Sequence, residues 1–227
     1  MELLNTPPRL LVFDMDGTFM DSQIFHAKTF HRFINRYIAP IDFETTRRKM
    51  GNTVRHILTE AGVPPEEMAA VYAQLTEFCE HDIDDLIAEV GVIDGIRDAL
   101  VNARARGLRC IVLTNSMETV AKKMLTYHGL LTLFDNVSGA DLASNDKVDR
   151  CNTIIKSRGF CPADTVCIGD SEFDIEMANS VGTRSCFVKT DYSWYRSEAY
   201  IMEYLKPTYV VSALNQIPDV FYGGESK

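Results

Sequence analysis

The sequence has little positive charge and no long apolar run. Its 227 residues include 23 lysines and arginines against 32 acids, a net charge of −9. An acidic chain is not expected to bind nucleic acid, because displacing counterions from phosphates needs a basic excess. No apolar stretch approaches the ~20 residues that a membrane helix needs. The N-terminus, with Glu2 and Pro7–Pro8, does not have the pattern of a signal peptide. We therefore expect neither a nucleic-acid partner nor a membrane partner.

Paired cysteine motifs are also missing. The six cysteines form no CxxC pair and no zinc-ligand spacing. Cys110, Cys167 and Cys186 lie inside apolar runs, where a cysteine usually packs as a small core residue. Reduced, buried thiols are typical of the cytosol, so we expect a cytoplasmic protein.

The sequence is nevertheless apolar enough (46%) to form a sizeable core. From residue 92 onward, strand and helix patterns alternate. The expected strands are 10–14, 109–115, 136–141, 165–170, 184–190 and 208–213. The expected helices are 94–107, 117–129, 149–159 and 173–182. Near-continuous apolar strands joined by helices predict an α/β fold, with a parallel sheet covered on both faces.

Residues 22–90 have no strand pattern. In 66–89, and again in the first part of the segment, apolar residues recur at helical spacing. We interpret these apolar stripes as packing surfaces rather than as a cofactor site. The segment is expected to be an all-helical domain, inserted into a core formed by residues 1–21 and 91–227.

Three of the expected strands end in polar groups. The first ends at Asp14, with Asp16 two residues later, the second of these strands ends at Thr114-Asn115, and the third ends at Asp170. Lys147 lies in the chain between the second and the third. Each motif alone could be a turn, a helix cap or a surface residue. Ligands of open parallel sheets bind beyond the carboxyl ends of the strands, and all of these groups are expected there. Their order along the chain therefore predicts a binding site.

The residue types point to phosphoryl chemistry. The carboxylates of Asp14, Asp16 and Asp170 would repel one another without a hard cation, and Mg²⁺ prefers oxygen ligands. Thr114 and Lys147 offer a hydroxyl and a positive charge to an anion. An aspartate that faces a phosphoryl group is a candidate nucleophile, and a second carboxylate two residues later could transfer protons.

These motifs resemble those of the haloacid dehalogenase-like superfamily, over nearly the whole chain. They are DxDGT at 14–18, Thr114-Asn115 after an apolar strand, Lys147, and GDSxxD at 169–174. The resemblance implies a Rossmann-like three-layer core with a helical cap of the C1 type, here residues 22–90. It further implies that the tail at 207–221 forms a final strand and helix.

The resemblance also implies individual roles. The catalytic residues would be the nucleophile Asp14, the general acid and base Asp16, and the phosphoryl-binding pair Thr114 and Lys147. The substrate contacts would include Gly17, Thr18 and Asn115. The Mg²⁺ site would comprise Asp14, Asp16 through its backbone carbonyl, Asp170, and Asp174, which would support the metal shell or Lys147.

Several residues at or next to the motifs narrow the choice of subfamily. Val148 follows Lys147, where this subfamily usually has proline. Asp16 excludes the dehalogenases proper and the phosphonoacetaldehyde hydrolases. The run Gly169-Asp170-Ser171, with Asp174, is closer to phosphoglycolate phosphatases than to β-phosphoglucomutases. We therefore expect a Mg²⁺-dependent phosphatase that hydrolyses a small phosphorylated metabolite through a phospho-aspartate. The alternatives are a phosphomutase, or a phospho-aspartate signalling module, which would lack a cap of this length.

The substrate and the oligomeric state, monomer or dimer, stay open. The dense basic run at 46–56 contains Arg47, Arg48, Lys49, Arg55 and His56. Arg55 is the candidate ligand for a second anionic group, although a solvated helix face would have the same pattern. His26 and the aromatic segment 192–204 each allow a site role or a packing role.

Overall fold

The computed structural model describes residues 7–141 and 146–222. A sheet of six parallel strands lies at the centre of the described chain, in the order β5-β4-β1-β6-β7-β8. The strands are β1 (Leu10–Phe13), β4 (Arg109–Met117), β5 (Asn136–Ala140), β6 (Thr165–Gly169), β7 (Arg184–Val188) and β8 (Tyr209–Val211). β1 lies between β4 and β6, so its carboxyl end is next to theirs.

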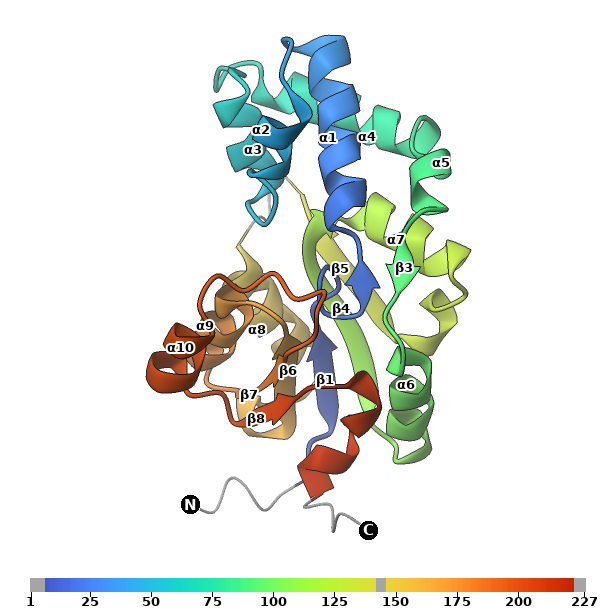
Figure 1. The fold of residues 1–227 in the computed structure, drawn as a ribbon. Helices are drawn as coiled ribbons and strands as arrows, with labels where there is room; N and C mark the ends of the chain where they lie inside the picture. Colours follow the sequence, from blue (N-terminus) through green and yellow to red (C-terminus); the bar gives the residue numbers. More distant parts are fainter. Residues whose placement is uncertain (1–6, 142–145, 223–227) are drawn as a thin grey trace.

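Helices cover both faces of the sheet (Figure 1). On one face, Leu11 and Phe13 pack with α6 (Ile96–Ala105) and α7 (Glu118–Tyr127). On the other face, Leu10 and Val12 pack with α8 (Lys147–Ser157) and α9 (Glu172–Val181). Successive side chains of a strand point to opposite faces, so this alternation makes β1 fully buried. The expected three-layer α/β core is confirmed.

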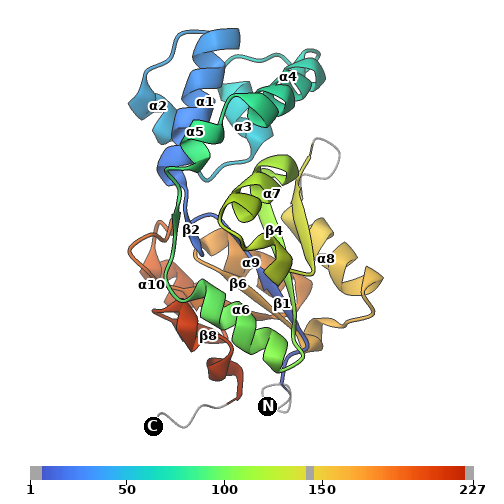
Figure 2. The ribbon, with the colours of Figure 1, turned by 90° about the vertical axis from the view of Figure 1, so that its right-hand side faces the viewer.

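Five helices lie beyond the carboxyl ends of the strands (Figure 2). They are α1 (Gln23–Tyr37), α2 (Phe43–Arg47), α3 (Val54–Glu60), α4 (Met68–His81) and α5 (Asp84–Ile87), which we call the helical insert. A two-stranded antiparallel ribbon, β2 (Met20–Asp21) with β3 (Gly91–Val92), carries the chain into the insert and out of it. Lys123 of α7 donates to Asp84 of α5 at 2.7 Å, and Tyr72 to the Ala140 carbonyl at 3.2 Å.

The structure corrects several predicted element boundaries. α8 begins at Lys147 instead of residue 149, because the Asp146 side chain caps it by accepting from the amides of Val148 and Asp149. The pattern at 66–89 divides into α4 and α5 at the fully buried Ile83. β4 continues to Met117, two residues past its expected end.

The C-terminal region also differs from the expectation. After β7, a short α10 (Glu198–Tyr200) continues into a π-helical turn (Ile201–Leu205). The expected last helix is replaced by two 3-10 turns, Leu214–Gln216 and Asp219–Tyr222. Pro218 lies between them, and a proline lacks the amide hydrogen that a continuous helix would use.

Among the described residues, no helix combines the length and apolarity needed to cross a membrane.

Candidate active site

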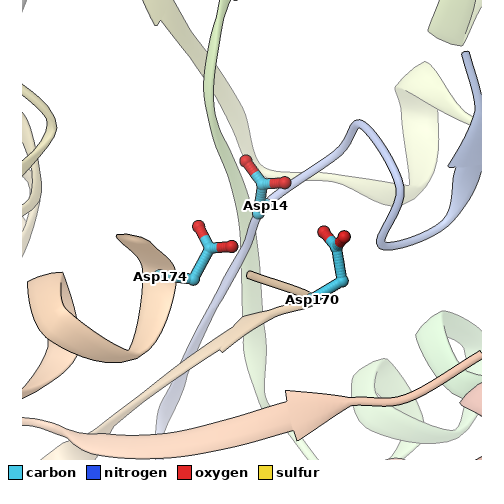
Figure 3. A group of neighbouring side chains, drawn as sticks. All are labelled: Asp14, Asp170 and Asp174. Atoms are coloured by element: carbon cyan, nitrogen blue, oxygen red, sulfur yellow. The ribbon is translucent and has the colours of Figure 1, made fainter. Parts of the chain in front are cut away.

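Three carboxyl groups converge where β1 and β6 end. Asp14 follows β1, Asp170 follows β6, and Asp174 lies in the first turn of α9. One oxygen of each lies within 4.8 Å of the others, and Figure 3 shows all three side chains pointing to the same side of the sheet edge. Asp170 and Asp174 are almost fully buried. The structure thus brings together three of the predicted metal ligands.

Two glycines allow this close approach. Gly17 has φ +81°, and a Cβ there would lie 2.6 Å from both Asp170 Oδ2 and the Trp194 ring. A Cβ on Gly169 would lie 2.3 Å from the side chain of Asp174. Only glycine fits a left-handed turn or so short a contact without strain. Asp174 also accepts from the amide and hydroxyl of Ser171, so it caps α9 as well as facing the site.

Lys147 bridges two of the carboxylates. Its Nζ lies 2.6 Å from Asp14 Oδ1 and 2.7 Å from Asp174 Oδ1. Burial disfavours the charge on Lys147, but the two acids outweigh this effect and raise its pKa above the usual value. Burial raises the pKa of Asp14 to about 7, although Lys147 opposes the shift. Burial and the neighbouring acids Asp174 and Asp14 also raise the pKa of Asp170. The site therefore has more negative charge than one lysine balances.

Asp16 lines the same cavity, and its two carboxylate oxygens are hydrogen-bonded to four side chains. Its Oδ1 accepts from Ser22 Oγ at 2.6 Å and lies 2.7 Å from His26 Nε2. Its Oδ2 accepts from Thr114 Oγ1 at 2.9 Å and Ser116 Oγ at 2.7 Å. Burial alone would raise the pKa of Asp16, but the charge of His26 and these hydrogen bonds hold it below the usual value. The two aspartates of the first motif thus have opposite pKa shifts.

The other predicted residues of the core take different positions. Thr114 and Asn115 line a cavity above the carboxylates. The buried Arg150 fixes them by donating to the Thr114 carbonyl at 2.9 Å and to Asn115 Oδ1 at 3.1 Å. Gly17 and Thr18, expected to contact substrate, are absent from the described lining of this cavity. The fully buried Thr18 hydroxyl donates to Asp170 Oδ1 at 2.8 Å instead, so it orients a carboxylate.

The basic side chains of the run at 46–56 are not among the described residues that line the cavity, although other residues of this run are. In α3, Val54, Ile57 and Leu58 are buried, and Arg55 lies on the exposed side between them. Within that run, Lys49 pairs with Glu60 at 2.7 Å and Arg47 with Glu44 at 2.9 Å. Arg55 is not among the described residues that line the cavity. Arg55 therefore lies on a solvated helix face, which is one of the two interpretations that the sequence allowed.

The sequence did not assign three residues that the structure places at the site. His26, whose role was left open, reaches Asp16 from the first turns of α1. The Trp194 ring lines the cavity, and its backbone amide donates to Asp170 Oδ2 at 2.5 Å. Arg196 also lines the cavity, with its guanidinium 5.6 Å from the centre of the Phe173 ring. His26 was the one with a detectable signal, its position shortly after the DxD motif, whereas the aromatic composition of 192–204 fitted packing equally well.

The cavity has two unlike walls. The core wall contains the acids of the motifs, with Asp14, Asp16, Lys147 and Asp170 among its residues. The insert wall is formed by α1, α3, α4 and the loop before α3. Its apolar residues are Phe25, Phe30, Met50, Val54, Ile57, Leu75 and Cys79. This arrangement can hold an anion against the core wall and the remainder of a ligand against the insert wall.

Comparison with known proteins identifies the family. The family model described as haloacid dehalogenase-like hydrolase matches residues 11–188. The chain belongs to the haloacid dehalogenase-like hydrolase family. This match confirms the family that the motifs resembled, and with it the expected class of enzyme, a hydrolase.

Relatives with known names differ in activity. The tyrosine-protein kinase PtkA of Mycobacterium tuberculosis is 26% identical over 188 residues, which are 82% of this chain and 63% of PtkA. The chain thus spans less than two thirds of that relative's length. The phosphoglycolate phosphatase of Rhodobacter capsulatus is 31% identical over 183 residues, 76% of this chain and 80% of the relative. The crystal structure of CbbY from Rhodobacter sphaeroides in complex with phosphate shows the same fold, with TM-score 0.73, 19% identity and coverage of 92% and 96% of the two chains.

Proposed function

We propose that the protein is a Mg²⁺-dependent phosphatase that hydrolyses a small phosphorylated metabolite. The observation that carries this proposal is the position of Asp14. Its carboxylate lines the cavity, 2.6 Å from the buried Lys147 ammonium and beside Asp170 and Asp174. A carboxylate fixed next to a cation and a candidate metal site is well placed to attack a bound phosphoryl group.

A magnesium ion fits the residues present. Three oxygens from Asp14, Asp170 and Asp174 lie within 4.8 Å of one another, and hard oxygen ligands suit Mg²⁺. The raised pKa values of Asp14 and Asp170 reflect buried negative charge that a cation would neutralise. Asp14 and Asp170 would hold the ion, with Asp174 and the backbone carbonyl of Asp16 completing the site. When bound, it would offset the charge that the carboxylates and the phosphoryl oxygens bring together.

The residues of the core wall account for both halves of a hydrolysis. In the first, an Asp14 oxygen attacks phosphorus, the ester P–O bond breaks, and the leaving oxygen takes a proton from the Asp16–His26 pair. In the second, water attacks the phosphorus of the phospho-aspartate while Asp16 accepts a proton from it. The P–O bond to Asp14 breaks, and inorganic phosphate leaves. Lys147, Thr114 and Asn115 hold the phosphoryl oxygens through both steps.

The His26–Asp16 pair is central to this scheme. Asp16 has a lowered pKa, so by itself it would be ionised and a poor acid at neutral pH. The 2.7 Å distance between Asp16 Oδ1 and His26 Nε2 provides a route for the missing proton, since an imidazolium beside a carboxylate can pass one on. We therefore assign the proton to the pair instead of to Asp16 alone.

The domain division belongs to the same proposal. Residues 1–21 and 91–227 would form the catalytic core and 22–90 a cap, with the β2–β3 ribbon as their connection.

The named relatives include a protein kinase and phosphatases, so family membership alone does not select the reaction. Free cysteines, five buried and one exposed, support the expected action in the cytoplasm on a soluble metabolite.

The test is phosphate release from p-nitrophenyl phosphate by the purified full chain with Mg²⁺. We expect turnover that EDTA abolishes and added Mg²⁺ restores. No release of phosphate, or equal release in EDTA, would contradict the proposal. Activity that requires a sugar bisphosphate and returns the phosphoryl group to a sugar would identify a phosphomutase instead.

A further inference from the structure

The insert wall has a composition that the proposed reaction does not explain. Six of its side chains, from three helices, are apolar and at most 7% exposed. They are Phe25 and Phe30 of α1, Val54 and Ile57 of α3, and Leu75 and Cys79 of α4. Several phosphate-bearing metabolites are covered with hydroxyl or carboxylate groups, and such groups lose hydrogen bonds to water against a wall of this kind.

The insert wall also lacks a partner for a second anion. Among the described residues that line the cavity, the only cationic or ionisable basic side chains are His26, Lys147 and Arg196. His26 is engaged with Asp16, and Lys147 with Asp14 and Asp174. Arg196 comes from the core, beside Phe173. A carboxylate at the far end of a substrate would therefore meet apolar side chains and the amides of Gln23 and Asn52, but no free positive charge of the insert among the described lining residues.

One polar group on the insert wall lacks a partner. Thr29 of α1 lines the cavity, is 3% exposed, and its Oγ1 has no hydrogen-bond partner among the described residues. A buried hydroxyl without a partner is costly, so such groups are usually paired. A ligand with one hydrogen-bonding group amid an apolar body would complete this wall.

We infer that the leaving group is a predominantly apolar alcohol, whose hydrocarbon body lies against the insert wall and whose single polar group meets Thr29. This inference rests on the proposed phosphatase function and specifies its substrate class. It sets phosphomonoesters of aryl-alkyl or branched alkyl alcohols above phosphoglycolate and above polyhydroxylated sugar phosphates. The driving force is the removal of apolar surface from water on both sides.

Phosphonates can test the inferred leaving-group site by binding alone. Their P–C bond is not an ester bond, so a phosphatase does not hydrolyse it. The wild-type full chain with Mg²⁺ is titrated with 3-phenylpropylphosphonate, 3-phosphonopropionate and methylphosphonate. Trp194, the only tryptophan of the sequence, lines the cavity and reports binding through its fluorescence. We expect the phenylpropyl compound to bind at least about tenfold more tightly than methylphosphonate. We expect 3-phosphonopropionate to bind no more tightly than methylphosphonate.

Two outcomes would overturn the inference separately from the proposed function. Tightest binding of 3-phosphonopropionate, or equal binding of all three compounds, would exclude an apolar leaving-group site while leaving the phosphatase intact. Failure of all three to bind would instead overturn the proposed anion site, and this inference with it.

Variants of the insert wall locate the effect. Cys79→Leu enlarges the side chain by two non-hydrogen atoms and so reduces the space in the cavity. Phenylpropylphosphonate should then bind about tenfold more weakly, while the binding of methylphosphonate is unaffected. Thr29→Val removes the unpaired hydroxyl, and the phenylpropyl compound, which offers it no partner, should bind at least as tightly as before. Thr119→Val is the matched control, because its hydroxyl is also unpartnered among the described residues but lies outside the cavity. Equal weakening of both phosphonates by Cys79→Leu would overturn the inference.

Discussion

The two walls of the cavity are built on different physical principles. On the core wall, Asp14, Lys147 and Asp170 bring buried charges together. Lys147 pairs with Asp14, and the Thr18 hydroxyl orients Asp170. On the insert wall, the side chains of α1, α3 and α4 are apolar and belong to the same hydrophobic cluster as the sheet face. The polar residues that α1 adds to this wall include Thr29 and His26, and His26 reaches across to Asp16.

This difference separates chemistry from selection. Electrostatic stabilisation depends on donors and acceptors fixed before the substrate arrives, and the sheet ends provide that rigidity. Apolar surface is less demanding in geometry and is suited to distinguishing one leaving group from another by shape and area. We therefore expect changes on the core wall to abolish turnover and changes on the insert wall to alter which substrate is turned over.

The largest effect is expected from Asp14→Asn. The amide is a far weaker nucleophile than the carboxylate, so kcat for p-nitrophenyl phosphate should fall by about a thousandfold or more. Phosphate release with saturating Mg²⁺ measures it. Asp98→Asn, at an exposed position on α6, is the control and should keep full activity. Retained turnover in Asp14→Asn would exclude Asp14 as the nucleophile.

His26→Gln should reduce kcat by roughly tenfold to a hundredfold, because general acid–base assistance is typically of this order or more. A glutamine can still hydrogen-bond to Asp16 but brings no charge. Since the His26 charge lowers the pKa of Asp16, its removal should raise that pKa and move the acid limb of the pH–rate profile to higher pH. A lower rate with an unmoved acid limb would mean that His26 has only a structural role.

His31→Gln is the matched control for this histidine. His31 lies on the same helix, its ring is 5.6 Å from that of Phe43, and it does not line the described cavity. Its replacement should change neither kcat nor the acid limb.

Stability in EDTA should depend on pH in an unusual direction. The pKa of Asp14 rises from 3.8 to about 7 on folding, and that of Asp170 rises as well. The folded state therefore holds these protons to higher pH than the unfolded state does. The resulting stabilisation is complete below about pH 4 and is lost as the pH rises through about 7. Asp16 has the opposite shift, but its contribution changes only at lower pH.

The measurement is Tm between pH 5 and 8, with EDTA or with Mg²⁺. In EDTA, we expect Tm to fall by roughly 3–6 °C across this range. Mg²⁺ should remove the fall, because it stabilises the ionised carboxylates, and Asp14→Asn should make the slope shallower. A Tm that rises with pH in EDTA would contradict the charge balance described for the core wall.

The sequence predicted the core wall better than the insert wall, for a physical reason. Asp14 and Asp170 each follow a buried strand and Thr114 lies near the carboxyl end of another, and parallel strands must bring these ends to one edge. Lys147 was predicted from its order among the motifs and from the family resemblance. The helix start that leads it to the same edge, with Asp146 as its cap, was not predicted. Arg55 could not be placed, because helical spacing alone does not tell which side of a short helix meets its neighbours. Trp194 and Arg196 reach the site from an irregular segment, where sequence patterns specify no direction.

The smallest expected effect distinguishes two arginines, one near each wall. Arg196 lines the cavity and its guanidinium is held over Phe173, whereas Arg55 is exposed outside it. An arginine at the cavity attracts a dianionic substrate, so Arg196→Ala should raise KM by about threefold to tenfold with little change in kcat. Arg55→Ala should change KM by less than about twofold, as expected for an exposed charge screened by solvent. KM values for p-nitrophenyl phosphate at low and high salt measure both. A larger effect from Arg55 would mean that the insert turns its basic face toward the substrate during turnover, and the apolar insert wall would then not be the surface that selects it.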